Sequence, residues 1–139
     1  MAVADPARIL LFHEHRMTSG NVRELLAMEG FEVTLARSFV DAVAHLAPGR
    51  SDVLLVYLPE TEFVRNTFLS ETRQAAPALP IVAMAEVVSD ELRRLFARFG
   101  VAAVLLARAP WREVLRTIRE TLAADEAGTT KFNQPRRNT

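Results

Sequence analysis

The run Ser51-Asp52-Val53-Leu54-Leu55-Val56-Tyr57-Leu58-Pro59-Glu60 decides the fold of this chain. It is nearly all apolar, it contains β-branched residues, and a proline ends it. A strand that is buried on both faces of a parallel sheet has this composition. Ligands and catalytic groups of such sheets lie just beyond the carboxyl ends of the central strands. The function is therefore expected to depend on the end of this run, where the sequence has Tyr57.

Strand-like and helix-like segments alternate along the rest of the chain. Besides the central run, apolar strand patterns cover residues 8–12, 32–36, 81–85 and 101–106. The first helical pattern is capped by Thr18 or Ser19 and closed by Gly30. The other helical patterns run from Ser38 to Pro48-Gly49, from Pro59 to about Ala75, from Ser89 to Gly100, and from Pro110 to Leu122. The apolar stripes of the first and third helices include Leu25 and Phe63. This alternation predicts an α/β fold with a doubly wound, five-stranded parallel sheet in the flavodoxin-like order 2-1-3-4-5.

The composition excludes several classes of protein. The 139 residues carry no net charge and no cysteine, so neither a general attraction to nucleic acid or anionic membranes nor a disulfide or zinc-thiolate site is expected. The longest apolar runs are too short to cross a bilayer, and residues 1–6 do not have the pattern of a signal peptide. We expect a cytoplasmic protein with one domain over residues 1–124 and a flexible tail over residues 125–139.

The tail carries a short basic and aromatic motif made of Lys131, Phe132, Arg136 and Arg137. Such a motif can dock on a protein partner or touch nucleic-acid phosphates. With so few charges a solvated chain end is the simpler interpretation, and a nucleic-acid partner is not expected.

Four segments carry a resemblance to a known family. They are Arg8-Ile9-Leu10-Leu11, Glu29-Gly30-Phe31-Glu32-Val33-Thr34-Leu35-Ala36, the run from Asp52 to Leu58-Pro59, and Leu79-Pro80-Ile81-Val82. In this order and at this spacing they resemble the response-regulator receiver domain, the CheY-like (βα)5 fold of two-component signalling. The resemblance covers residues 7–122.

The resemblance implies a site for phosphoryl transfer to an aspartate. In the family an acidic pair after strand one holds Mg²⁺, an aspartate ends strand three, a hydroxyl residue follows strand four and a lysine follows strand five. The carboxylates supply hard oxygen ligands, and the metal and the lysine offset charge on the phosphoryl oxygens. At these positions this chain has His13 and Glu14 for the acidic pair, Tyr57 for the aspartate, Ala85 for the hydroxyl residue and Ala107 for the lysine.

Two of these losses do not depend on the alignment. The only lysine is Lys131, which lies in the tail. Of the aspartates, only Asp52 lies on a predicted strand, and it lies about 16 Å from Tyr57, at the opposite end. We therefore interpret the chain as a degenerate pseudo-receiver that lacks the phosphoacceptor aspartate and the lysine. No catalytic residue, metal site or cofactor is expected.

Tyr57 is expected to plug the former phosphate site. Ala85 and Ala107 leave volume that a phenol ring can occupy, with the hydroxyl close to His13. The segment His13-Glu14-His15 has ligand atoms for zinc, but alternation along a strand separates Glu14 from the two histidines. Arg108 follows the position of the missing lysine and is the candidate contact for an anion, unless it is simply solvated at its loop.

A partner interface is predicted on the face formed by the helix after Ser89, the strand at 101–106 and the helix after Pro110. This face is the usual contact surface in the family, whose aromatic switch position is Val104 here. The candidate residues are Val87, Val88, Arg94, Arg98, Val104, Trp111, Arg112 and Arg116. The alternative, that these side chains pack beneath their own helices, stays open at this point.

These features together favour a phosphorylation-independent signalling domain. It would act by protein–protein contact, with a partner or as a homodimer, in a bacterial pathway of the two-component or phosphorelay type, with the tail as a candidate addition to the contact. The alternative is a ligand-responsive module that binds a small anion or metabolite at the degenerate site. An enzyme is not expected, because no nucleophile–base pair or phosphate loop can be identified.

Overall fold

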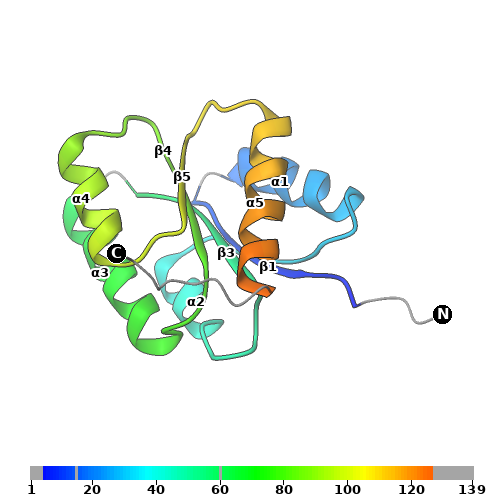
Figure 1. Cartoon of the computed structure of the whole chain (residues 1–139), viewed down its shortest axis with the longest axis horizontal. Coiled ribbons are helices and arrows are strands. Elements are labelled where there is room, and N and C mark those ends of the chain that lie inside the picture. The colour runs from blue at the N-terminus through cyan, green and yellow to red at the C-terminus, as the bar shows by residue number, and fades with distance from the viewer. Residues whose placement is uncertain (1–4, 15, 60, 127–139) are drawn as a thin grey trace.

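The fold has three layers, with one sheet between two sets of helices (Figure 1). The computed structural model describes residues 5–14, 16–59 and 61–126 of the chain. The strands are β1 (Arg8–Phe12), β2 (Glu32–Ala36), β3 (Val53–Tyr57), β4 (Ile81–Ala85) and β5 (Ala103–Leu106). The helices are α1 (Arg16–Met28), α2 (Phe39–Ala44), α3 (Glu62–Ala75), α4 (Asp90–Arg98) and α5 (Trp111–Glu126).

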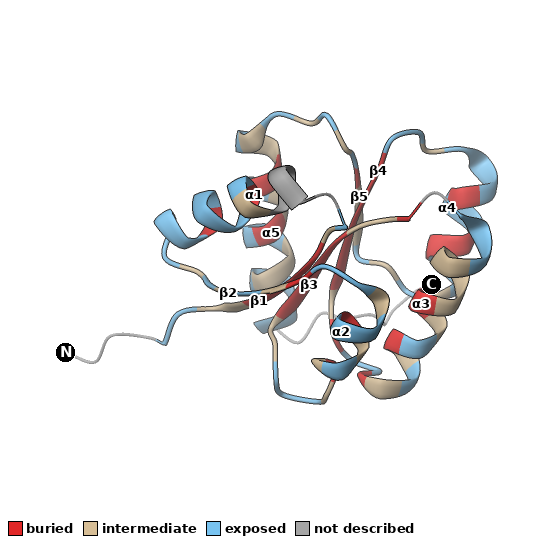
Figure 2. Cartoon of the chain, turned by 180° about the vertical axis from the view of Figure 1, so that it is seen from behind, coloured by how far each residue is buried: buried red, intermediate tan, exposed pale blue. Residues whose placement is uncertain are grey.

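The sheet has the predicted order β2-β1-β3-β4-β5, and every adjacent pair of strands is parallel. Successive side chains of a strand point to opposite faces, so the central strand β3 feeds two cores. Its Leu54 and Val56 pack on the side of α2, α3 and α4, whereas Val53 and Leu55 pack on the side of α1 and α5. Figure 2 shows buried residues along the middle of the sheet and along the inner sides of the helices.

Two helices end where glycine was expected to close them. At the end of α4, Gly100 has a φ of 65°, its N–H donates to Ala97 O, and the Val101 N–H donates to Phe96 O. This is the Schellman arrangement, which needs one residue in the left-handed backbone conformation, and only glycine adopts that conformation without strain. Gly30 ends α1 with the same pair of bonds.

Several element boundaries differ from the prediction. Helix α1 already begins at Arg16, so the predicted cap residues Thr18 and Ser19 lie inside it. Helix α2 ends at Ala44, because the next N–H groups bond three residues back and tighten the chain into a turn. Strand β5 begins at Ala103, because Val101 is part of the turn that closes α4.

Two predicted stripe residues are exposed. Phe63 lies in the first turn of α3, ahead of the residues that contact the sheet, and keeps 75% of its surface in solvent. Leu25 is exposed to 39%, while its neighbours Val22 and Leu26 on α1 are buried. The face of α1 that packs on the sheet is therefore narrower than the sequence pattern predicted.

Helix α5 runs past the predicted end of the domain. Asp125 and Glu126 continue the helix, and the rest of the predicted tail lies outside the described residues. Within the described ranges, no helix combines the length and the apolar character that crossing a membrane requires.

Candidate functional site

The carboxyl ends of the strands bring together the positions where the family's chemistry is expected. Phe12, the last residue of β1, pairs with Val56 of β3, so the residues that follow them, His13 and Tyr57, lie side by side. The ladder continues across β4, because the Ala107 N–H donates to Ala85 O at 2.8 Å. The candidate positions therefore line one edge of the sheet in strand order.

At this edge the side chain of Tyr57 stacks on His13. The two ring centroids are 4.0 Å apart and the planes differ by 13°. The phenol is half-buried and packs against the core on the α1 and α5 side, and this burial raises the pKa of Tyr57. The two rings contact each other face to face, so the imidazole packs on the aromatic ring of Tyr57 and does not contact the Tyr57 hydroxyl alone.

Apart from His13 and Tyr57, the candidate positions at this edge carry methyl groups or an exposed carboxylate. Ala85 and Ala107 offer only methyl groups, and Glu14 is exposed beyond the end of β1. Glu86, which the sequence analysis did not single out, follows Ala85 and is also exposed. Within residues 5–14, 16–59 and 61–126, no three histidine, aspartate or glutamate side chains gather as a metal site would need. His15, part of the segment considered for zinc, lies outside this range.

Arg108 lies apart from the stacked rings. It is exposed and lines a cavity of about 540 Å³ together with Val88 and Val104, and this cavity is not lined by His13 or Tyr57. The cavity beside the candidate anion contact therefore does not include the two aromatic residues.

The predicted interface residues fall into three groups on the surface. Val87, which is 74% exposed, lines a hollow between α3 and α4 with Arg94 and Arg98. Val88 and Val104 line the cavity beside Arg108, but both also pack against the core. The remaining residues, Trp111, Arg112 and Arg116, line a hollow on α5. Val88 and Val104 thus pack in part beneath their own elements while Val87 is exposed, and a partner interface on this face stays a prediction.

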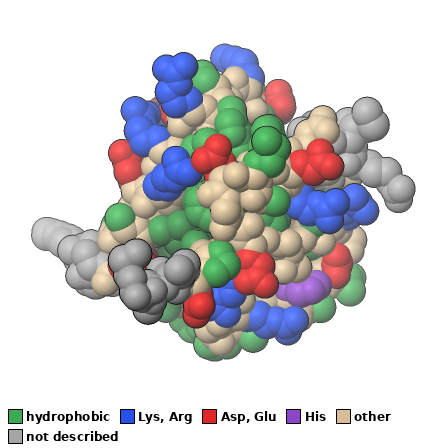
Figure 3. All heavy atoms as spheres, turned by 90° about the vertical axis from the view of Figure 1, so that its right-hand side faces the viewer, with side chains coloured by type: hydrophobic (Ala, Val, Ile, Leu, Met, Phe, Trp, Pro, Cys, Tyr) green, Lys and Arg blue, Asp and Glu red, His purple; other side chains and the backbone are tan. Residues whose placement is uncertain are grey.

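Charge is mixed on the surface. The face in Figure 3 shows basic and acidic side chains interspersed, with hydrophobic patches between them. On this face, neither sign of charge forms a continuous patch.

At the opposite edge of the sheet, a cluster of hydrogen bonds surrounds Arg73. Arg73, in the last turn of α3, donates to Phe99 O and Gly100 O at the end of α4, at 2.6 and 3.1 Å. It also donates to the carbonyls of three residues that follow α3, which are Ala76, Pro77 and Leu79. One guanidinium thus caps the carboxyl ends of two helices, where a cation is favourable. Burial lowers the pKa of Arg73.

Sequence analysis missed Arg73 because its partners are backbone carbonyls that lie up to 27 residues away. A basic residue in the last turn of a helix is common and does not indicate by itself what it bonds. The prolines at 77 and 80 marked the link between α3 and β4 but not this contact.

Comparison with solved structures relates the fold to receiver domains. A CheY-like receiver domain from Methanospirillum hungatei is 20% identical, with a TM-score of 0.80, covering 88% of this chain and 98% of that one. The non-phosphorylated HemR receiver domain from Leptospira biflexa is 16% identical, with a TM-score of 0.75, covering 94% and 99%. The receiver domain of an HD domain-containing protein from Pseudomonas fluorescens is 18% identical, with a TM-score of 0.77, covering 88% and 98%.

No protein-family model and no curated protein matches the sequence. The solved structures show that the chain has the CheY-like receiver fold, with the predicted α/β architecture and strand order. At these identities the likeness establishes the fold alone, so the function has to be argued from the site.

Proposed function

We propose that this chain is a pseudo-receiver, a receiver-fold domain that signals by protein–protein contact without phosphorylation of an aspartate. The receiver fold itself points to two-component signalling. The observation that carries the proposal is the end of β3, where Tyr57 stacks on His13 in place of a phosphoacceptor.

The chemistry of the neighbouring positions supports the proposal. Aspartyl phosphorylation needs a carboxylate nucleophile, metal ligands and a cation to offset the charge on the phosphoryl group. Here alanines stand at the positions of the hydroxyl residue and the lysine, and the only lysine of the chain is Lys131. Asp52, the one aspartate on the central run, lies before the start of β3 and bonds to Arg8.

Direct phosphorylation tests the first half of the proposal. The chain is incubated with an acyl phosphate and Mg²⁺ and its intact mass is measured, beside a receiver domain that has the aspartate as a positive control. We expect an adduct on the control and none on this chain. A phosphoryl adduct on this chain that hydroxylamine removes, as it removes an acyl phosphate, would contradict the proposal.

The second half concerns the contact surface around α4, β5 and α5, for a protein partner or a second copy of the chain. Val87→Asp is the sharpest variant, because this side chain is exposed and its replacement leaves the core intact. Val40→Asp on α2, at 79% exposure, is the matched control. We expect Val87→Asp to weaken self-association or the capture of partners from a lysate, and Val40→Asp to leave both unchanged.

A small-anion sensor is the competing function. A ligand that binds the folded state raises its melting temperature, so a thermal-shift screen of phosphate, sulfate and carboxylic acids distinguishes the two. A shift that is lost in Arg108→Met would favour the sensor, while no shift with any anion favours the protein-contact proposal.

A further inference from the structure

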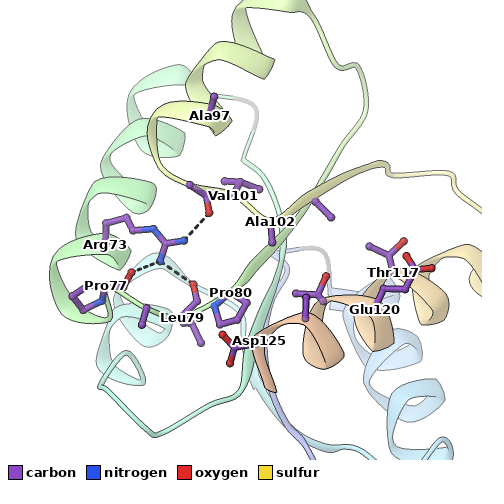
Figure 4. A pocket seen from close by; sticks show the side chains of 15 residues that line it. Arg73, Pro77, Leu79, Pro80, Ala97, Val101, Ala102, Thr117, Glu120 and Asp125 are labelled. Atoms are coloured by element: carbon purple, nitrogen blue, oxygen red, sulfur yellow. Dashed lines mark hydrogen bonds between the residues drawn. The ribbon is translucent and has the colours of Figure 1, made fainter. Parts of the chain in front are cut away.

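A groove of about 830 Å³ lies at the amino edge of the sheet (Figure 4). One wall is the last part of α5, which presents Thr117, Glu120 and Asp125. The other wall is made by the link from α3 to β4 and by the end of α4, with Leu79 and Val101 among its apolar residues. Its lining consists mostly of alanine, proline, leucine and valine side chains. The groove is therefore suited to an apolar side chain.

The charges of the groove are separated between its two walls. Arg73 directs its donors at backbone carbonyls on the α3 and α4 side, which holds that wall in place. Glu120 and Asp125 are exposed on the α5 side. An occupant with an apolar anchor and cationic neighbours fits this arrangement, with the cations on the α5 side.

The chain itself supplies a segment of this chemistry. Asp125 lines the groove, and Glu126, the last residue of α5, is the last residue that the structure describes before residues 127–139. Residues 127–139 contain one aromatic side chain, Phe132, and no acidic residue. Their charged residues are all basic and are Lys131, Arg136 and Arg137.

We infer that residues 128–137 bind back into this groove in the same molecule, with Phe132 in its apolar part and the basic residues near Glu120 and Asp125. Six residues in extended form span about 20 Å, whereas the wall from Thr117 to Asp125 is about 12 Å long. Gly128 permits the reversal of direction at the end of α5. β5 is the edge strand of the sheet, so an extended segment beside it can also add to the ladder.

This docking gives the groove an internal occupant. A protein that uses the same groove has to displace residues 128–137 first. Its apparent association constant is therefore multiplied by the fraction of chains in which the groove is empty. The inference does not depend on the proposed pseudo-receiver function, because the groove lies at the other edge of the sheet from Tyr57.

The absence of cysteine makes a spin-label experiment direct. A nitroxide is attached to Asn133→Cys in the otherwise unchanged full-length chain, and the amide signals of the ¹⁵N-labelled protein are measured before and after reduction of the label. We expect the amides of Ala78, Ala102 and Thr121 at the groove to lose most of their intensity. Val87, at the opposite edge, should keep nearly all of its intensity.

Two variants in the labelled background test the anchor. Phe132→Ala should restore the groove signals. Phe63→Ala, which removes an exposed ring on α3, should leave the broadening unchanged. Broadening that is spread evenly over the molecule, or that persists in Phe132→Ala, would overturn the inference.

A mixing experiment separates one molecule from two. Spin-labelled chain without ¹⁵N is added to ¹⁵N-labelled chain without the cysteine, at equal concentrations. We expect no broadening in this mixture. Groove signals that broaden here would mean that the occupant is a second copy, and would overturn docking within one chain.

Discussion

The two edges of the sheet differ in what holds them. At the carboxyl edge, Tyr57 and His13 make a stacked aromatic pair, and alanines occupy the neighbouring strand ends. At the amino edge, Arg73 bonds to five backbone carbonyls, and Arg8 pairs with Asp52. Ring packing dominates the edge where a receiver carries its chemistry, and charge-assisted hydrogen bonds dominate the other.

This difference bears on function. A phosphorylated switch needs charges at the carboxyl edge that change partners when the phosphoryl group arrives. The stacked rings of Tyr57 and His13 hold this edge by packing, which fits the proposed role without aspartyl phosphorylation. The hydrogen bonds of Arg73 instead connect the ends of α3 and α4, beside the groove at the amino edge.

Replacing Arg73 by methionine should have the largest effect. The change keeps much of the apolar stem but leaves the carbonyls at the ends of two helices without their shared donor, and we expect a loss of about 2–4 kcal/mol in the free energy of unfolding. Arg73→Lys should recover little of it, because a single ammonium cannot reach carbonyls on both helices. Urea unfolding followed by circular dichroism measures the change.

Arg98→Met is the matched control for this variant. Arg98 is an exposed arginine in the last turn of α4, and its replacement should stay within about 0.5 kcal/mol. If Arg73→Met were equally mild, the amino edge would not be held by this guanidinium, and the contrast between the two edges would disappear.

Removing the ring at the carboxyl edge should have a smaller effect. Tyr57→Ala deletes a half-buried ring and its stack on His13, and should cost about 1–3 kcal/mol by the same unfolding measurement. Tyr57→Phe keeps the ring and should cost less than about 1 kcal/mol. A loss in Tyr57→Phe as large as in Tyr57→Ala would show that the hydroxyl, not the ring, fixes this edge.

The ionisation of Tyr57 gives a second measure of how far its ring is buried at the carboxyl edge. It is the only tyrosine, so the absorbance change of tyrosinate reports this residue alone. Burial raises its pKa, so the midpoint should lie above 10 in the folded chain and near 10 in denaturant. His13→Ala uncovers one face of the ring and should move the folded midpoint toward 10.

The sign of the linked stability change follows from this shift. Below pH 10 the phenol is neutral in both states and has no effect on stability. Above it the unfolded chain loses the proton first, so the free energy of unfolding falls as the pH rises through the folded pKa. Tyr57→Phe should remove this part of the alkaline loss. An identical pH dependence in the two proteins would mean that the ring is as hydrated as in the unfolded chain.

The sequence predicted the parts of this molecule that depend on periodicity. Buried runs and helical stripes fixed the strand order, and parallel strand ends placed His13 beside Tyr57. The sequence did not predict side-chain contacts between segments that are distant along the chain. The bonds from Arg73 to the end of α4 depend on how two helices happen to end together, and the exposure of Phe63 depends on how far α3 extends beyond the sheet. The face-to-face stack likewise depends on ring orientation, which residue types do not specify.

The smallest effect is expected at the Arg8–Asp52 pair. The Asp52 carboxylate accepts from the Arg8 backbone N–H at 2.7 Å and from its guanidinium at 3.2 Å, but the two side chains are 43% and 38% exposed. Burial by itself raises the pKa of Asp52, and the hydrogen bonds and charge of Arg8 outweigh it, so the pKa lies below its ordinary value. Asp52→Asn should therefore cost less than about 1 kcal/mol near neutral pH.

The stability of the protein at acid pH tests how much the Arg8–Asp52 ion pair contributes despite its exposure to solvent. Because the folded pKa is depressed, the stabilisation is present above the unfolded value of 3.8 and is lost as the pH falls through the folded pKa. The difference between the original chain and Asp52→Asn should shrink below pH 3.8 and also in high salt. Glu71→Gln, an exposed carboxylate on α3, should show no such dependence. A difference that survives both acid and salt would mean that the backbone hydrogen bond, and not the ion pair, carries the contact.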